Sequence, residues 1–506
     1  MNDTPQVNPW LTAVAVMAAT FMVVLDTTVV NVSLPYIAGS LSATVNESTW
    51  ALTSYVAANA IILPLTGWLA VVLGRKRLLI GSVLGFTVAS ALCGIAPSLP
   101  LLILFRIIQG ATGGVMQPLS QAVLLEAFPP QDRGKAMGFW GLGIVVAPIL
   151  GPVLGGWLTD NYSWRWVFYI NIPIGVLAFV LLRAFVHDPP YLKRHSAAID
   201  YWGIALMTIG IGALQIMLDK GQEDDWFEST LITTMAILAV GGIIAFVIRE
   251  FSTEHPVIDL HVFKDRTYAA GATLMTVVGF VLFGSLVLLP VMMQTMMGYP
   301  PIQAGIALAP RGMGSLIAMP LVGLITNKVD SRKLVAIGLA MGGVTLLWLG
   351  ELNLNAGYWD FFWPQFLQGA ALGLLFVPLS TVTMGSIPRE QVGNAASVFN
   401  LVRNIGGGVG IASVTTMLTR FRVTHASTMA EHITLYDPRI RMQVGALTDV
   451  RAAAGLQGQV LRSASLLAFI DSFRIMGLVF LALLPLVLLM RRQTPHGSES
   501  VVVAAE

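Results

Sequence analysis

The sequence predicts an all-α integral membrane protein, and three observations lead to that prediction: its composition, its long apolar stretches and its sparse charge. Of 506 residues, 55% are hydrophobic and 11% are charged, whereas soluble domains carry about 25% charged residues. A helix that spans a bilayer takes about 20 apolar residues, so fourteen such helices would use roughly 280 residues of the chain. The composition therefore suits a polytopic helical protein and excludes an ordinary soluble one.

Charge and cysteine content exclude further classes of protein. A formal net charge of +2 argues against a nucleic-acid binder that relies on bulk positive charge. Cys93 is the only cysteine, so neither a disulfide framework nor a cysteine metal site is expected. The first ten residues carry no Lys or Arg, and the apolar run that follows has the length of a span and contains Asp26. We therefore expect no cleavable signal peptide.

Fourteen apolar stretches are separated by short polar segments. They fall at 11–35, 49–72, 78–96, 99–124, 136–158, 166–186, 199–218, 229–249, 267–297, 302–326, 334–351, 361–386, 393–418 and 465–490. An even number of spans places both termini on one side. The basic segments 75–77, 193–194 and 328–333 lie in loops on that same side, so the positive-inside rule predicts that both termini are cytoplasmic.

The sequence repeats itself at an offset of about 259 residues. Gln109-Gly110-Ala111 recurs as Gln368-Gly369-Ala370, and Pro118-Leu119-Ser120 recurs as Pro378-Leu379-Ser380. The repeat predicts a bundle of six helices at 1–190, two inserted helices with linkers at 191–262, a second bundle at 263–490 with a long loop at 419–464, and a tail at 491–506. Parallel repeats of this kind are typical of a transporter whose site lies between the halves.

Two charges inside predicted spans are the most informative residues. Asp26 lies roughly 14 Å from the outer end of its span and Arg106 roughly 10 Å from the same face, at 1.5 Å per residue. Charges at such depth are expensive and are usually paired or functional. Pairing would keep Asp26 ionised, and loss of the partner would favour its neutral form, so this carboxylate could carry a proton. The alternative is a static salt bridge that only joins two helices.

Two further patterns suggest moving parts. Span 136–158 carries Gly138, Gly151, Pro152, Gly155 and Gly156. Glycines permit close helix approach and prolines allow bending, as a rocking bundle requires, although ordinary membrane-helix packing uses the same residues. The turn with Gly67, Gly74, Arg75, Lys76 and Arg77 is either a gating loop or a charge cluster that only sets topology. A related Gly323 with Arg332-Lys333 in the second half favours gating.

Several weaker signals complete the set. Asp471 and Arg474 are three residues apart and are expected to neutralise each other on one helix face. The seven histidines fall in predicted loops or tails, and no metal-binding spacing or nucleophilic triad is present, so no metal and no catalytic residue is expected. The residues proposed to line a substrate cavity are Asn31, Gln109, Gln117, Phe280, Met292 and Gln294.

The chain resembles a known family at several of these positions. The stretch 25–35 around Asp26, the pair Arg106-x2-Gln109-Gly110 and the motif Gly151-Pro152-x2-Gly155-Gly156 resemble the fourteen-span drug:proton antiporters of the major facilitator superfamily. The segments 164–175, 214–221, 225–227 and 363–369 are similar to the EmrB-type pumps of tripartite efflux systems. The resemblance covers nearly the whole chain and implies the major facilitator fold: two six-helix bundles plus two inserted helices.

The resemblance also implies roles and partners. In that family the span-one Asp and the span-four Arg are implicated in proton coupling, the glycine-proline run is the antiporter motif, and the loop before the last span is periplasmic. The expected partners are a periplasmic adaptor and an outer-membrane channel, and the energy source is the proton gradient rather than a cofactor. Two residues depart from the pattern. Val71 stands where the common loop motif has an acidic residue, and Ala147 replaces a glycine.

These observations together predict a proton-coupled antiporter that exports hydrophobic or amphipathic drugs across a bacterial inner membrane. Within transport, the alternative is a dedicated exporter of one metabolite, fatty acid or siderophore. A lipid-handling enzyme should show a nucleophile and a base at matched depth, and none is evident in the sequence. A scaffold would have little need of Asp26 and Arg106 inside the bilayer.

Overall fold

The computed structural model describes residues 8–188, 200–253, 256–326, 328–432 and 450–490, and all regular secondary structure within these ranges is helical. The first half contains α1 (Pro9–Ser40), α2 (Val45–Leu73), α3 (Arg75–Ile95), α4 (Leu99–Gly113), α5 (Met116–Ala127), α6 (Arg133–Asn161), α7 (Trp166–Tyr169) and α8 (Asn171–Phe185). The inserted helices are α9 (Tyr201–Lys220) and α10 (Thr230–Ser252). The second half contains α11 (Arg266–Met296), α12 (Pro301–Ile325), α13 (Ser331–Leu349), α14 (Tyr358–Gly385), α15 (Val392–Glu431) and α17 (Val450–Ala482). Short 3-10 helices are η1 (Pro130–Asp132), η2 (Trp226–Glu228), η3 (Leu260–Lys264), η4 (Arg389–Gln391) and η5 (Leu484–Leu489).

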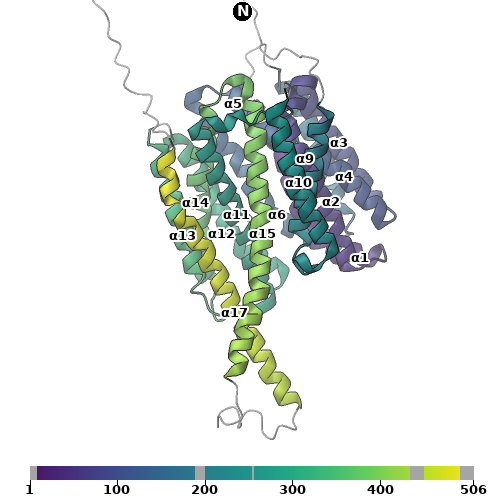
Figure 1. Cartoon of the computed structure of the whole chain (residues 1–506), viewed down its shortest axis with the longest axis vertical. Helices are drawn as coiled ribbons and strands as arrows, with labels where there is room; N and C mark the ends of the chain where they lie inside the picture. The colour runs from purple at the N-terminus through teal and green to yellow at the C-terminus, as the bar shows by residue number, and fades with distance from the viewer. Residues whose placement is uncertain (1–7, 189–199, 254–255, 327, 433–449, 491–506) are drawn as a thin grey trace, which may run out of the picture.

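The helices match the fourteen predicted spans. Thirteen candidate spans among the described residues are long and apolar enough to cross a membrane, one of them made of α4 with α5 and another of α7 with α8. The fourteenth is α15, which covers the predicted span 393–418. It is less apolar than the others because Asn394, Asn400, Arg403 and Asn404 lie along it. It nevertheless runs the full height of the bundle (Figure 1).

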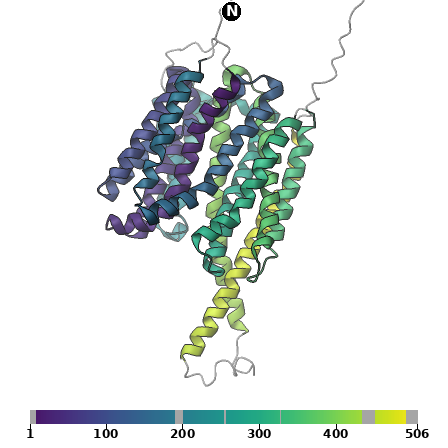
Figure 2. The same ribbon diagram turned by 180° about the vertical axis from the view of Figure 1, so that it is seen from behind.

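The two halves repeat the same helix contacts, which confirms the duplication inferred from the sequence. In the first half α1 packs on α6, α2 on α4, and α3 on both α4 and α8. In the second half α11 packs on α15, α12 on α14, and α13 on both α14 and α17. Figure 2 shows the first-half helices on one side and α11–α14 on the other. The halves meet where α6 lies against α12 and α14, and where α15 lies against α2 and α5.

The bundle has two distinct ends. The terminal end, as we name it, is where α1 begins at Pro9 and η5 ends at Leu489 (Figure 1). The hairpin end is the opposite one, where α15 ends and α17 begins. The predicted loop 419–464 is helical over most of its length, because α15 continues to Glu431 and α17 starts at Val450. At 1.5 Å per residue the thirteen residues of α15 beyond 418 add about 20 Å, and Figure 1 shows this helical pair projecting past the bundle.

The inserted helices form a pair attached to both halves. Gly210 of α9 and Gly242 of α10 lie in direct contact, since an added Cβ on Gly242 would be 2.8 Å from the Gly210 Cα. α9 also packs on α2 and α15. At its hairpin end Lys220 bonds Glu223 at 2.7 Å and lies 5.6 Å from the ring centre of Trp50. The pair is therefore fixed to the bundle by polar contacts as well as by apolar packing.

Asp200 caps the other end of α9. Its carboxylate accepts the backbone N–H of Gly203 at 3.1 Å and pairs with the Arg249 side chain of α10 at 3.0 Å. Burial by itself would raise the pKa of Asp200, but the hydrogen bonds from Arg249 and Gly203 outweigh it and the pKa is lowered. The charged form of Asp200 thus links the start of α9 to the end of α10.

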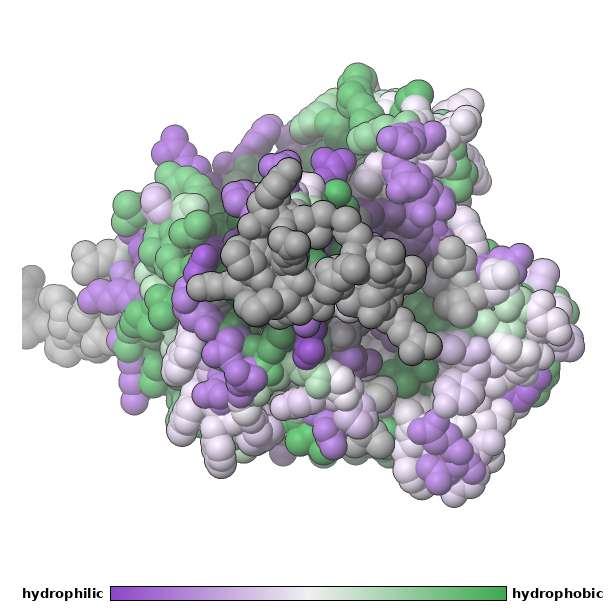
Figure 3. Space-filling model, turned by 90° about the horizontal axis from the view of Figure 1, so that it is seen from below, coloured by the Kyte–Doolittle hydropathy of each residue, from purple (hydrophilic) through white to green (hydrophobic). Residues whose placement is uncertain are grey.

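The surface is apolar where helices face outward. Exposed side chains on α8, α10 and α13 include Leu177 at 56%, Ile237 at 68% and Ile337 at 54%. Such residues need an apolar surrounding, and the bilayer supplies it. Figure 3 looks onto the hairpin end, where polar residues are spread over the face and apolar residues lie along several edges. The chain is a multi-pass membrane protein.

Candidate functional site

Asp26 and Arg106 form an ion pair inside the first half, as their similar depths predicted. The Arg106 guanidinium donates from Nη1 to Oδ2 of Asp26 at 2.6 Å, and both side chains are 0% exposed. Asp26 comes from α1 and Arg106 from α4, so the pair joins two helices. A charge buried to this extent must be paired and hydrogen-bonded, or it is neutralised.

Two amides complete the surroundings of the Asp26 carboxylate. Gln109 donates from Nε2 to Oδ1 at 2.9 Å, and Asn171 of α8 donates from Nδ2 to the same oxygen at 2.7 Å. Asn171 also donates to Ser90 of α3 at 2.9 Å. The carboxylate therefore accepts three hydrogen bonds from three side chains. The donors come from α4 and α8, so the carboxylate connects α1 to both helices.

The Arg106 side chain is held on its other faces as well. Its Nε donates to the Ala51 carbonyl of α2 at 3.0 Å, and its Nη1 also donates to Oε1 of Gln109 at 2.7 Å. The guanidinium carbon lies 4.0 Å from the ring centre of Tyr55, which permits a cation–π contact. Because α1, α2, α3, α4 and α8 all contribute a group, any change in the charge of Asp26 acts on five helices at once. We name this set the Asp26 cluster: Asp26, Tyr55, Ser90, Arg106, Gln109 and Asn171.

Glycines of the glycine-proline run in α6 make close contacts with two different helices, α1 and α12. An added Cβ on Gly151 would lie 2.0 Å from Oγ1 of Thr28, and one on Gly155 would lie 2.7 Å from the Val29 carbonyl oxygen. These two glycines let α6 pack closely on α1, next to Asp26. Gly138 instead meets α12, since its added Cβ would lie 2.6 Å from the Met319 carbonyl oxygen. An added Cβ on Gly156 would make only an ordinary contact, with Cγ1 of Val32 at 3.9 Å.

The prolines of this run lie within α6 without ending it. Pro148 and Pro152 are both inside the α-helix Arg133–Asn161. α6 is thus one continuous helix. It touches α1 near the Asp26 cluster, and the first turns of α6 touch α12 of the other half. A displacement of α1 can therefore be transmitted to the contact between the halves.

Two symmetry-related glycine contacts join the halves at the terminal end. An added Cβ on Gly67 of α2 would lie 2.9 Å from the Asn394 Cα of α15, and one on Gly323 of α12 would lie 2.7 Å from the Gly134 carbonyl oxygen of α6. Gly134 and Gly393, the neighbour of Asn394, occupy equivalent positions in the repeat. The halves therefore approach to backbone contact at this end in the same way on both sides.

The basic turn after Gly67 makes contacts within the first half. Gly74 has a φ of 84°, which glycine adopts without strain, and it joins α2 to α3. Arg75 is 3% exposed and forms an ion pair with Glu126 of α5, which supplies an acidic partner although Val71 is not acidic. Lys76 donates from its backbone N–H to Asp188 and from Nζ to the Arg183 carbonyl, each at 2.8 Å. Arg77 is exposed.

The family described as the Major Facilitator Superfamily matches residues 16–411 of this chain, well over half of its length. The chain belongs to this superfamily. It is 38% identical over 482 residues to the multidrug export protein EmrB of Escherichia coli (strain K12), covering 94% of each chain. It is also 38% identical over 485 residues to the fatty acid resistance protein FarB of Neisseria gonorrhoeae, covering 94% of this chain and 95% of that protein. Within the superfamily it is therefore an EmrB-type protein.

Solved structures agree on the fold. The human organic anion transporter MFSD10 (TETRAN) matches with a TM-score of 0.62 at 13% identity, covering 95% of this chain and 99% of that one. The proton:xylose symporter XylE matches with a TM-score of 0.58 at 15% identity, covering 96% and 97%. These similarities establish the major facilitator fold, and the family match with the EmrB relative points to a transporter rather than an enzyme.

The six residues predicted to line a substrate cavity have different surroundings. Gln109 belongs to the Asp26 cluster, and Gln117 of α5 accepts a hydrogen bond from Arg403 of α15 at 2.7 Å. Met292 is 3% exposed and belongs to a large apolar cluster, and the partly buried Phe280 packs against the same cluster. Asn31 and Gln294 are exposed. These contacts do not decide whether the six residues line one cavity, and the substrate cavity stays a prediction.

The contact between the halves contains polar residues that the sequence analysis did not assign to a site. Asn400 of α15 donates to Oε1 of Gln121 on α5 at 2.7 Å, one helical turn from the Arg403–Gln117 bond. Arg403 is 4% exposed, and both pairs cross from the second half to the first. Repeated polar residues at intervals of three or four along α15 were the available signal.

The charges near the end of the chain pair differently from the prediction. Asp471 bonds His425 of α15 at 2.8 Å, and Arg474 bonds Glu351 at 2.7 Å, so Asp471 and Arg474 do not neutralise each other. His425 therefore lies in a helix and not in a loop. Among the residues that the structure describes, no group of three His, Cys, Asp or Glu side chains is placed to hold a metal ion.

Proposed function

We propose that this protein is a proton-coupled exporter of hydrophobic or amphipathic compounds, with Asp26 as the proton carrier and Arg106 as its partner. The observation that carries the proposal is the fully buried Asp26–Arg106 pair with its ring of amide donors. An ionisable pair at membrane depth is usually functional. Related proteins are named for multidrug export, which supports the choice of cargo.

Protonation of Asp26 removes the charge that holds its three donors. The bond from Arg106 weakens because it loses its ionic component, and one carboxyl oxygen becomes a donor in place of an acceptor. The α1 segment around Thr28 then shifts relative to α4, and α6 follows because Gly151 packs directly on Thr28. Since α6 also contacts α12, the shift reaches the contact between the halves and favours the alternate orientation of the transporter.

The test is drug-induced proton movement in proteoliposomes across a pH series. Asp26→Asn keeps the shape of the side chain but cannot titrate, so coupled exchange should disappear while the drug still binds. Arg106→Lys keeps the charge but loses the planar fork, so partial activity is expected. Asp160→Asn removes an exposed carboxylate of α6 that only accepts from Tyr36 and serves as the matched control. If Asp26→Asn exchanges drug for protons at a normal rate, the Asp26–Arg106 pair is only a structural salt bridge.

The 38% identity to a fatty acid resistance protein favours a second cargo, fatty acids. The two cargo classes separate in one assay. Pump-deficient cells that express the transporter are challenged with fatty acids and with neutral or cationic drugs. Protection against fatty acids alone would identify a dedicated exporter, whereas protection against several unrelated compounds would identify a multidrug pump.

We further propose that the protein resides in a bacterial inner membrane with both termini cytoplasmic and works with a periplasmic adaptor and an outer-membrane channel. The helical pair 419–431 and 450–464 supports this arrangement, because it projects from the hairpin end and offers a surface outside the bilayer (Figure 1). Removing the projection should abolish resistance in cells and leave exchange in liposomes largely intact. Equal loss of both activities would make the projection a structural part of the pump.

A further inference from the structure

The second half contains a counterpart of the Asp26 cluster that lacks a carboxylate. The offset of 259 residues that relates Gln109 to Gln368 also relates Arg106 to Gln365. Tyr55 corresponds to Arg311 of α12, because Gly110 packs on the Tyr55 carbonyl and its repeat equivalent Gly369 packs on the Arg311 carbonyl. A guanidinium is therefore present in the second half as well, and it donates from Nη2 to Oγ of Ser285 at 2.9 Å. Among the described residues, no carboxylate pairs with it.

Arg311 is buried without a compensating charge. Its side chain is 4% exposed, and its Nε and Nη1 have no hydrogen-bond partner in the structure. Among the described residues it forms no salt bridge, and its one hydrogen bond goes to a neutral hydroxyl. A buried ion without a partner costs several kcal/mol, and in the first half the same problem is solved by Asp26.

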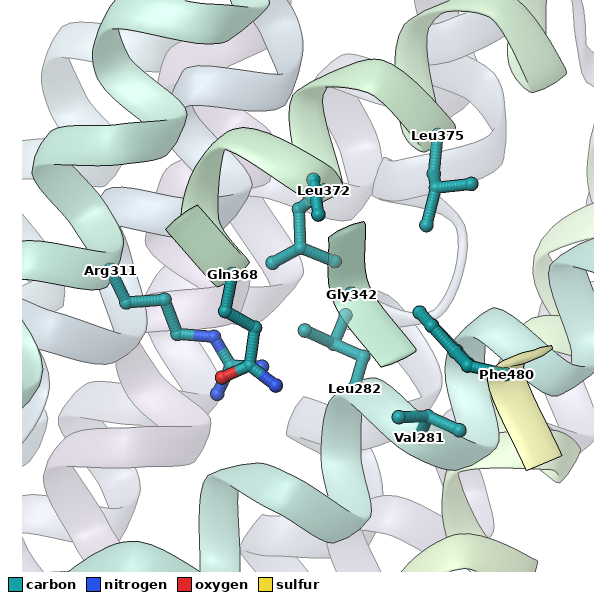
Figure 4. A pocket seen from close by; sticks show the side chains of 9 residues that line it. Val281, Leu282, Arg311, Gly342, Gln368, Leu372, Leu375 and Phe480 are labelled. Atoms are coloured by element: carbon teal, nitrogen blue, oxygen red, sulfur yellow. The ribbon is translucent and has the colours of Figure 1, made fainter. Parts of the chain in front are cut away.

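A small cavity lies beside this guanidinium. It has a volume of about 10 Å³ and is lined by Arg311 and Gln368 together with apolar residues of α11, α13, α14 and α17. Figure 4 shows the Arg311 and Gln368 side chains converging on one side, with Leu282, Leu372 and Phe480 around the rest. The volume leaves room for one small species only, so an amphipathic cargo does not fit.

We propose that this cavity is a binding site for a small monoanion such as chloride, which neutralises Arg311 as Asp26 neutralises Arg106. The ion would accept from the free Nε or Nη1 of Arg311 and so tie α12 to the Ser285 region of α11 and to α14. This site differs from the proton site and does not depend on which compounds are exported. A bound water would fill the cavity but would leave the charge uncompensated.

The experiment measures thermal unfolding of the purified full chain in sodium chloride and in sodium gluconate at equal ionic strength. A ligand that binds only the folded state raises its stability in a saturable way. We expect the Tm of the wild-type protein to rise with chloride to a plateau, by about 2 °C or more, and not to rise with gluconate. An equal Tm in both salts would mean that water alone occupies the cavity and would overturn the proposal.

Three variants assign the effect to this cavity. Arg311→Met removes the charge and should abolish the response to chloride. Ser285→Asp supplies an internal carboxylate and should also abolish it, while raising the Tm in gluconate toward the wild-type value in chloride. Arg266→Met removes an exposed guanidinium of α11 and should leave the response unchanged. A chloride response that persists in Arg311→Met would place the anion elsewhere and refute the assignment.

Discussion

The antiporter motif of α6 offers a sharp test, because three of its glycines have different surroundings. An added Cβ on Gly151 would lie 2.0 Å from Oγ1 and 2.6 Å from Cβ of Thr28. Rotation of the Thr28 side chain can move Oγ1 but not Cβ. Ordinary contact begins at 3.4 Å, so Gly151→Ala must push α1 and α6 apart locally by about 0.8 Å. Gly155→Ala meets a backbone oxygen at 2.7 Å, which cannot rotate away.

The expected cost follows from these distances. Overpacking of a close contact costs about 1–3 kcal/mol, so Gly151→Ala and Gly155→Ala should each lower the free energy of unfolding by about that amount. Exchange should fall by tenfold or more, since about 1.4 kcal/mol corresponds to a factor of ten and Thr28 is two residues from Asp26. Gly156→Ala has 3.9 Å of clearance and should be neutral or stabilising, because alanine is favoured over glycine in helices.

The assay combines proteoliposome exchange with thermal unfolding of all three variants. Thr28→Gly removes both side-chain atoms that the new methyl group would meet, and the next contact is then the Thr28 carbonyl carbon at 3.1 Å. The double variant Thr28→Gly/Gly151→Ala should therefore recover part of the loss. If Gly156→Ala is as damaging as Gly151→Ala, or if Thr28→Gly gives no recovery, the motif does not act by making room for α1.

Further predictions concern the ends of the bundle. Gly67→Val should lower the Tm and the exchange rate because it separates the halves at the terminal end, whereas Gly81→Val, whose glycine has no atom within 4 Å, should change neither. Because the pKa of Asp200 is lowered in the fold, its charge stabilises the protein above its ordinary pKa, and this contribution is lost as the pH falls through the lowered value. Asp200→Asn should remove that acid dependence, measured by thermal unfolding between about pH 3 and 6. In a cysteine-free background, Thr428→Cys should react with an impermeant thiol reagent only from outside the cell and Lys333→Cys only from inside, and the reverse pattern would invert the predicted topology.

The spans, the duplication and the partnership of Asp26 with Arg106 could all be predicted from the sequence. Each depends on a property that is local or that repeats along the chain. A helix that spans a bilayer needs about 20 apolar residues, and a repeat is visible as recurring short sequence motifs. Two opposite charges at the same depth are stabilised most readily by pairing with each other. The major facilitator fold followed from these properties and from family resemblance.

The extent of α15 and α17 could not be read from apolar length. Their outer segments leave the apolar region, so polarity indicated a loop where the backbone is helical. Residues 420–431 contain neither Gly nor Pro. This absence of helix breakers indicated that α15 continues beyond its apolar part. Polarity reports the surroundings of a segment, whereas helix formation depends on backbone propensity and on packing between the two helices.

Only the tertiary structure decided which side chains meet. The sequence placed Gly151 and Gly156 in one motif, but α1 lies against the first and leaves space at the second. It placed Gln109 among the cavity residues, whereas the structure shows its amide donating to the Asp26 carboxylate. It also left Arg311 unassigned, because only the packing of α12 shows that this guanidinium is buried and bonds the neutral hydroxyl of Ser285. The reason is physical: helical periodicity determines which residues share a face, and only the packing of helices determines what each face contacts.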